Sequence, residues 1–297
     1  MKLFTFYKND GICLGVEKEG VLFDVEKVQQ QSCNEKVQTN VMDIIYGGNE
    51  ALKKLTTLVD KTDHTDESLH VQEDTISWGP AVTSPSKIIC VGLNYKKHAD
   101  ETKSPYPEVP ILFNKFSNAL TGHRTEITIP KTTKRLDYEV ELGIVIGKRG
   151  KYIKEEAALD YVFGYCTTND ISARDIQKRT SQWMTGKTND GFAPVGPFLV
   201  PKEYVPNPNN LQLTTTLNGE VRQDSNTADM IFSCEQLISY ISSYMTLFPG
   251  DLIMTGTPEG VILGLPKEER VYLQDGDELT VEVEMLGALT NTFVSES

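Results

Sequence analysis

The chain has 297 residues, of which 39% are hydrophobic and 24% charged, a composition typical of folded globular proteins and not of disordered or fibrous ones. There are 42 acidic and 29 basic residues, and the net charge of −13 argues against partners rich in phosphate, such as nucleic acids and anionic membrane surfaces. No apolar run is long enough to span a bilayer. The first residues turn polar too soon for a signal peptide, and the five scattered cysteines lack a C-x-x-C pair, so we expect reduced thiols in a cytoplasmic protein.

The first quarter of the chain combines strand patterns with helix patterns. Apolar and polar residues alternate between turn signals, which predicts a three-stranded antiparallel meander over residues 3–7, 12–16 and 21–25. Helical spacing follows over residues 42–45 and 51–59, with Gly47 and Gly48 between them. The polar stretch 60–75 is typical of a linker. We therefore expect a small α+β N-terminal domain over residues 1–77 and a second domain over residues 78–297.

The second part is rich in short apolar runs separated by Gly and Pro turns. These runs predict strands at 87–92, 140–146, 211–217, 251–255 and 278–283. Helical patterns are confined to 154–161, 171–180 and 230–244. We expect a β-rich α+β fold, either a β-barrel or stacked mixed sheets, with few helices at the periphery.

Two carboxylates stand on one face of the predicted strand that begins near residue 138. Alternation of side chains places Glu139 and Glu141 about 7 Å apart, opposite an apolar face. An E-x-E pattern alone is often a solvated strand edge. Here the following residues are apolar on both faces, which indicates a buried strand, and buried carboxylates need a partner or a metal.

A third carboxylate, Asp170, comes at the point where a second predicted strand runs into a helix. It is a candidate metal ligand, and equally a candidate helix N-cap. Three hard oxygen ligands without histidine or cysteine would select Mg²⁺, Mn²⁺ or Ca²⁺ over zinc. Loops of the D-x-[DN]-x-[DN]-G kind are missing, which disfavours a calcium-binding module.

Other groups suited to acid–base chemistry or anion binding are spread along the chain. His98 and Glu101 are three residues apart, so on a helical turn the carboxylate can orient the imidazole as a general base, although such a pair is also common on exposed helices. Lys187 follows Gly186 in a loop that lacks the full phosphate-binding motif. The small residues at 255–257 would let backbone N–H groups approach an oxyanion, or would simply form a tight turn.

Taken together and in order, these segments resemble the fumarylacetoacetate hydrolase family, in particular its bacterial branch with a small N-terminal domain. The matching pieces span residues 85–293: Val91-Gly92-Leu93-Asn94-Tyr95 with His98 and Glu101, Asp137-Tyr138-Glu139 with Glu141-Leu142, Asn169-Asp170-Ile171-Ser172-Ala173-Arg174-Asp175 with Gln177, Gly186-Lys187, Leu217-Asn218-Gly219-Glu220, Asp229 to Ser233, and Gly250-Asp251 with Thr255-Gly256-Thr257-Pro258. One departure is Phe116, where many relatives carry a proline after the lysine.

The resemblance implies a β-rich catalytic fold, a homodimer, and Mg²⁺ or Mn²⁺ held at Glu139, Glu141 and Asp170. It also implies a water-activating dyad of His98 and Glu101 on a mobile lid, with Lys187 as an electrophilic helper. Candidate substrate-binding residues come from the same segments: Asn94, Tyr95, Arg174, Gln177, Gly256 and Thr257.

The implied substrates are small 2-oxo or 1,3-dioxo carboxylates that chelate the metal through carboxylate and keto oxygens. We interpret the chain primarily as a hydrolase of a C–C bond in an acylpyruvate, with oxaloacetate decarboxylation or enol–keto tautomerisation of a related diacid as the alternative, because all three reactions pass through an enolate. A non-catalytic metal-bound protein is the rival from another class.

Overall fold

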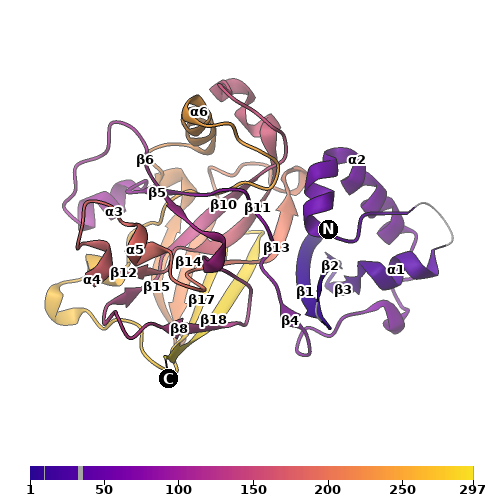
Figure 1. Ribbon diagram of the computed structural model, residues 1–297, viewed down its shortest axis with the longest axis horizontal. Helices are drawn as coiled ribbons and strands as arrows, with labels where there is room; N and C mark the ends of the chain where they lie inside the picture. Colours follow the sequence, from indigo (N-terminus) through magenta and orange to yellow (C-terminus); the bar gives the residue numbers. More distant parts are fainter. Residues whose placement is uncertain (10, 33–35, 297) are drawn as a thin grey trace.

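The computed structural model describes residues 1–9, 11–32 and 36–296. Its strands form a large mixed sheet in the order β3-β2-β1-β13-β11-β10-β16-β5-β6, a second sheet in the order β15-β14-β17-β18-β8, and a β12-β9 pair (Figure 1). β4 also pairs with β1, and β7 with β13. Within the described ranges neither order returns to its first strand, so the β-rich fold predicted from the sequence is confirmed as mixed sheets and not as a closed barrel.

The N-terminal part contains the predicted meander, followed by two helices. Its elements are β1 (Lys2–Lys8), β2 (Gly11–Lys18), β3 (Val21–Asp24), α1 (Val25–Gln31) and α2 (Val41–Asp60). α1 was not predicted, and it begins where the Asp24 side chain accepts hydrogen bonds from the backbone N–H groups of Glu26 and Lys27. α2 unites the two predicted helices across a kink at Gly48, whose φ of 56° is accessible to glycine.

The predicted linker packs against the meander instead of running free. It holds η1 (Glu67–Leu69), and the rings of His64 and His70 lie 5.1 and 5.3 Å from the ring of Phe23. The meander itself joins the large sheet, since Leu3 of β1 pairs with Leu199 of β13 (Ala193–Pro201). The large sheet therefore crosses the proposed division at residue 78, which stays a prediction.

The rest of the chain supplies the other strands and mostly short helices. The strands are β4 (Ser77–Trp78), β5 (Ile88–Gly92), β6 (Ile111–Lys115), β7 (Leu120–Thr121), β8 (Glu126–Ile129), β9 (Leu136–Asp137), β10 (Val140–Ile146), β11 (Val162–Asn169), β12 (Ser172–Ala173), β14 (Gln212–Leu217), β15 (Glu220–Asn226), β16 (Leu252–Met254), β17 (Glu278–Val283) and β18 (Gly287–Ser295). The helices are α3 (Lys96–Glu101), α4 (Arg174–Gln177), α5 (Met184–Lys187), α6 (Cys234–Tyr244), η2 (Ser117–Ala119), η3 (Glu155–Tyr161), η4 (Lys202–Tyr204), η5 (Thr227–Asp229), η6 (Ile262–Gly264) and η7 (Lys267–Glu269).

All three helices predicted in this part are shorter in the structure than in the prediction. The 154–161 segment forms a 3₁₀ helix. Ser172 and Ala173 pair with β9, so α4 begins only at Arg174, and α6 begins at Cys234 behind a capping box of Ser233 and Gln236.

β10 lies between two hydrophobic cores, which explains why it is apolar on both faces. Val140, Leu142 and Ile144 pack in the core that contains residues of β14, β17 and β18. On the other face Val145 belongs to the core formed with the N-terminal helices. Because the strand is covered on both sides, Glu139 before it and Glu141 within it are buried.

Two further expectations concern cysteines and membranes. Cys90, Cys166 and Cys234 are free and buried, and Cys13 is free and half-buried, whereas Cys33 lies outside the described residues. Among the described helices, none combines the length and the apolar character needed to cross a bilayer.

Candidate active site

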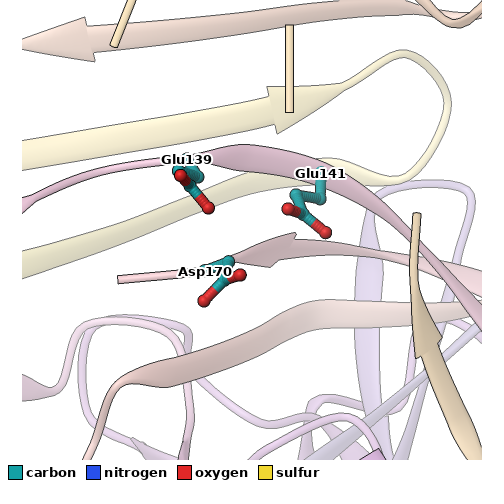
Figure 2. A group of neighbouring side chains, drawn as sticks. All are labelled: Glu139, Glu141 and Asp170. Atoms are coloured by element: carbon teal, nitrogen blue, oxygen red, sulfur yellow. The ribbon is translucent and has the colours of Figure 1, made fainter. Parts of the chain in front are cut away.

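Pairing of β10 with β11 brings the three predicted carboxylates together. Val140 pairs with Asn169, and the backbone N–H of Asp170 donates to the carbonyl of Glu139 at 2.9 Å. One oxygen from each of Glu139, Glu141 and Asp170 lies within 4.8 Å of the others (Figure 2). All three residues are buried. The structure thus assembles a group of hard oxygen atoms that can hold one divalent cation.

Two of the three carboxylates are already paired with buried cations. Glu139 contacts the Arg174 guanidinium and the Lys187 ammonium, each at 2.7 Å. Asp170 contacts Lys115 at 2.7 Å and Lys187 at 2.8 Å. Burial alone would raise the pKa of Glu139, but the charges of Arg174 and Lys187 outweigh it and lower the pKa to about 2. Glu139 is therefore ionised at neutral pH.

Glu141, unlike the other two carboxylates, is not paired with a cationic side chain among the described residues. It accepts a hydrogen bond from the backbone N–H of Gly256 at 2.9 Å, and it has no ion pair with any described residue. Burial raises the pKa of Glu141 well above its ordinary value, and the negative charges of Asp170 and Glu139 raise it further. A bound divalent cation would offset the cost of ionising Glu141. The three carboxylates therefore fit Mg²⁺ or Mn²⁺, because they are hard oxygen ligands and because Glu141 has no cationic side chain to balance its charge among the described residues.

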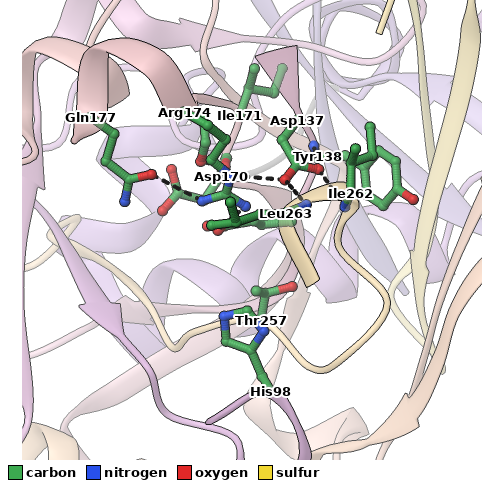
Figure 3. Close-up of polar contacts among 12 residues, drawn as sticks. His98, Asp137, Tyr138, Asp170, Ile171, Arg174, Gln177, Thr257, Ile262 and Leu263 are labelled. Carbon is green, nitrogen blue, oxygen red and sulfur yellow. Dashed lines mark hydrogen bonds and ion pairs between the residues drawn. The ribbon is translucent and has the colours of Figure 1, made fainter. Parts of the chain in front are cut away.

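Arg174 links the carboxylates to the rest of the site (Figure 3). Its Nε donates to Asp137 at 2.8 Å, and its Nη1 donates to the Gln177 side-chain oxygen at 3.1 Å. Asp137 in turn accepts from the backbone N–H groups of Ile262 and Leu263, at 2.9 and 3.0 Å. This chain of contacts fixes Arg174 against Glu139 and ties α4 to η6.

The predicted dyad is assembled on α3. Nδ1 of His98 lies 2.7 Å from Oε1 of Glu101, and the other oxygen of Glu101 accepts from the backbone N–H of Gly260 at 3.0 Å. A Cβ added at Gly264 would lie only 2.4 Å from the Glu101 carboxyl carbon, so a side chain there would displace this carboxylate from its contact with His98. The contact at Nδ1 leaves Nε2 of His98 for exchange of a proton with a ligand.

A cavity of about 710 Å³ joins the dyad to the carboxylates. Eight of the predicted site residues line it: His98, Glu101, Glu139, Glu141, Arg174, Gln177, Lys187 and Thr257. Other lining residues come from the end of β5, from Phe113 and Trp183, and from the 263–267 segment with Arg270. A small anionic substrate in this cavity would reach both the metal ligands and the base.

Four predicted residues lie behind the cavity lining. Asn94 is fully buried, and its side chain is hydrogen-bonded to Phe232 and to the Thr255 carbonyl. Tyr95 is also fully buried, whereas Asp170 reaches the site through its contacts with Lys115 and Lys187. Gly256 holds Glu141 from a φ of +100°, and a Cβ there would lie 2.8 Å from the Cβ of Asn94.

Sequence patterns did not reveal Lys115 or Asp137 as members of the charge network. The Lys115 ammonium is fully buried and contacts Asp170, the carbonyls of Ile171 and Phe192, and the carbonyl of Lys187. A signal was present, because a lysine inside an apolar strand needs buried partners. Nothing in the sequence identified those partners, which lie 55 or more residues away.

Comparison with known proteins decides the family. Residues 87–294 match the model described as fumarylacetoacetate (FAA) hydrolase C-terminal. The chain belongs to the fumarylacetoacetate hydrolase family. It is 38% identical to a mitochondrial oxaloacetate tautomerase of Xenopus laevis over 99% of this chain and 90% of that protein. It is 47% identical to a mitochondrial oxaloacetate tautomerase of Bos taurus over 72% of this chain and 68% of that protein.

Solved structures of the family agree with the fold. Fumarylacetoacetate hydrolase from Exiguobacterium antarcticum superposes with a TM-score of 0.83 at 33% identity, with full coverage of both chains. Maleylpyruvate hydrolase from Sphingobium sp. SYK-6, solved with manganese(II) and pyruvate, gives 0.78 at 27% identity, again with full coverage. A 5-carboxymethyl-2-hydroxymuconate delta-isomerase from Mycobacterium smegmatis gives 0.74 at 30% identity with full coverage. The chain is thus an enzyme of a family that includes tautomerases, isomerases and hydrolases.

Proposed function

We propose that this enzyme interconverts the enol and keto forms of oxaloacetate, or of a closely related 2-oxo diacid, with a divalent metal. The observation that carries the proposal is the 38% identity to an oxaloacetate tautomerase along nearly the whole chain. The site supports it, because one acid–base group faces a cluster of metal-binding carboxylates in a single cavity. Tautomerisation needs these two elements and no attacking water.

The carboxylates Glu139, Glu141 and Asp170 would hold Mg²⁺ or Mn²⁺. When bound, the metal supplies Lewis acidity that makes the 2-oxo group of a chelated substrate more acidic at C3. Arg174 and Lys187 keep Glu139 ionised and in place. Glu139 thereby stays ionised, as a metal ligand must be, before substrate arrives.

The proton transfer falls to His98. In ketonisation, Nε2–H of the imidazolium gives a proton to C3 as the C=C bond becomes a single bond. The enol O–H bond breaks, and its proton returns to the imidazole while C2–O becomes a carbonyl. Glu101 orients the ring through its contact with Nδ1. The positive charges of Lys187 and Arg174 lower the energy of the intervening enolate.

Hydrolysis of an acylpyruvate is the second candidate, and it was the primary interpretation of the sequence. The likeness to a maleylpyruvate hydrolase solved with manganese(II) and pyruvate favours it. In that reaction His98 would take a proton from water as the water attacks the distal carbonyl, and pyruvate enolate would leave. Decarboxylation of oxaloacetate forms the same enolate without water. We place the tautomerase first because the chain is 38% identical to an oxaloacetate tautomerase and 27% identical to the maleylpyruvate hydrolase.

A panel of substrates separates these reactions. With Mg²⁺ present, we expect rapid loss of enol-oxaloacetate absorbance, and slower turnover of acetylpyruvate and maleylpyruvate followed as pyruvate release. CO₂ release from oxaloacetate reports decarboxylation independently. Turnover of acylpyruvates that exceeds enol–keto conversion would contradict the tautomerase proposal and favour the hydrolase.

Three finer expectations accompany the proposal. The preferred metal is Mg²⁺ or Mn²⁺, for which the acidic triad provides support. Homodimerisation remains a prediction, to be tested by light scattering. A cytoplasmic location also remains a prediction, although the names of several related proteins describe them as mitochondrial.

A further inference from the structure

Four exposed or half-buried cationic side chains line the active-site cavity and have no acidic partner among the residues that the structure describes. They are Lys103, Lys178, Lys267 and Arg270. None of them forms an ion pair within the described ranges, in contrast to Arg174 and Lys187, whose charges are offset by Glu139, Asp137 and Asp170. In a chain with a net charge of −13, such an unpaired group of cations at one cavity is conspicuous.

Lys178 and Arg270 come from different elements and meet at this cavity. Lys178 directly follows α4, whose Arg174 and Gln177 also line the cavity. Arg270 follows η7, and its Nε donates to the Leu265 carbonyl at 2.7 Å, which anchors the guanidinium and leaves its terminal nitrogens free of described partners. Partial burial lowers the pKa of Lys178, and the nearby charges of Arg174, Arg270 and Arg135 lower it further. The neighbouring Glu268 and Glu269 are exposed and do not line the cavity.

We infer that Lys178 and Arg270, assisted by Lys267 and Lys103, bind the distal carboxylate of the substrate and make the enzyme selective for 2-oxo diacids over 2-oxo monoacids. This inference rests on the proposed function for the placement of the other end of the substrate. The carboxylate and keto oxygens at C1 and C2 go to the metal site, and the remaining chain extends past His98 toward the outer cations. A second carboxylate there would supply the negative charge that these side chains lack.

The inner and outer cations of the cavity would then have different roles. Arg174 and Lys187 are committed to the metal-binding carboxylates, so neither is free to make a full ion pair with substrate. A monoacid would leave the outer cations as they are. A diacid would relieve their mutual repulsion, and its preference over the monoacid should shrink as salt screens the exposed charges.

Calorimetry with a matched ligand pair tests the inference. 2-Oxoglutarate and 2-oxopentanoate have the same carbon chain and the same metal-binding end, and differ in a carboxylate against a methyl group. With saturating Mg²⁺, wild-type protein should bind 2-oxoglutarate more tightly. Lys178→Gln and Arg270→Gln should each reduce that preference about two- to fivefold, the usual worth of one exposed charge pair, and the double variant should abolish it.

Arg179→Gln is the matched control, because Arg179 is the exposed neighbour of Lys178 and does not line the cavity. It should leave the preference unchanged. Equal affinity of wild type for the two ligands, or an undiminished preference in the Lys178→Gln and double variants, would overturn the inference. If the preference behaves as expected but enol-oxaloacetate is not converted, the proposed reaction fails and the carboxylate site stands.

Discussion

Replacing Lys115 with methionine tests how far the carboxylates proposed to bind the metal depend on a buried cation outside the predicted site. The substitution keeps the length of the side chain and removes its charge. In the structure the ammonium is fully buried and lies 2.7 Å from Asp170, 3.1 Å from the Ile171 carbonyl and 2.7 Å from the Phe192 carbonyl. Methionine would leave Asp170 with Lys187 as its one remaining cation among the described residues.

The magnitude follows from the burial of both partners. Removing one member of a buried ion pair costs about 3–5 kcal/mol, because the other charge stays desolvated. The stranded carbonyls add to this cost, although the Phe192 carbonyl keeps a bond from the N–H of Ile171. We therefore expect Lys115→Met to lower the free energy of unfolding by about 3–5 kcal/mol.

Urea denaturation followed by far-UV circular dichroism measures the effect. The matched control is Lys97→Met, which removes an exposed ammonium 3.4 Å from Glu259 and should cost less than about 1 kcal/mol. Mg²⁺ should stabilise Lys115→Met more than it stabilises wild type, because the metal would replace part of the lost positive charge beside Asp170. Equal stability of wild type and Lys115→Met would refute the reasoning.

Three further predictions concern the dyad, a buried histidine and the lid. His98→Ala should reduce kcat for enol–keto conversion about 10²- to 10⁴-fold and should reduce the rate of oxaloacetate decarboxylation much less. Lys187→Ala should reduce the rates of both reactions. If His98→Ala slows the two reactions equally, the dyad has another role. Burial lowers the pKa of His123 to about 4, and the charge of Arg124 contributes, so protonation of this histidine opposes folding. The free energy of unfolding should therefore fall by up to about 3 kcal/mol as the pH drops from 6.5 toward 4. A His123→Gln variant that shows the same decline would contradict this prediction. Oxalate, an enolate mimic, should slow hydrogen exchange over residues 95–110 in the presence of Mg²⁺, and unaltered exchange would count against a lid.

The sequence predicted the carboxylates of the site better than their surroundings. Alternation along a strand was enough to place Glu139 and Glu141 on one face, and the apolar run behind them indicated burial. Asp170 joined them because β10 and β11 pair in the register that sets Val140 against Asn169. No local pattern contains that register, so the grouping of the three residues was a hypothesis until the strands were placed.

Local patterns failed where distant segments compete for the same backbone. The helix predicted over 171–180 reduces to α4, because Ser172 pairs with Asp137 and a Cβ at Gly186 would lie 2.5 Å from the backbone nitrogen of Gln177. The start of the predicted 230–244 helix is lost in a similar way, since Ile231 and Phe232 donate backbone hydrogen bonds to Asn94. The contacts of Ile231 and Phe232 with Asn94 join residues more than a hundred positions apart, and helical periodicity cannot report them.

Titration of Mg²⁺ into wild-type protein and into Asp170→Ala, followed by calorimetry, tests the central claim most directly. The claim is that Glu139, Glu141 and Asp170 hold the metal on which the chemistry depends. We predict one Mg²⁺ site per wild-type chain, and loss of that site in Asp170→Ala while the circular dichroism spectrum stays that of a folded protein. An unchanged Mg²⁺ affinity in the Asp170→Ala variant would contradict the account.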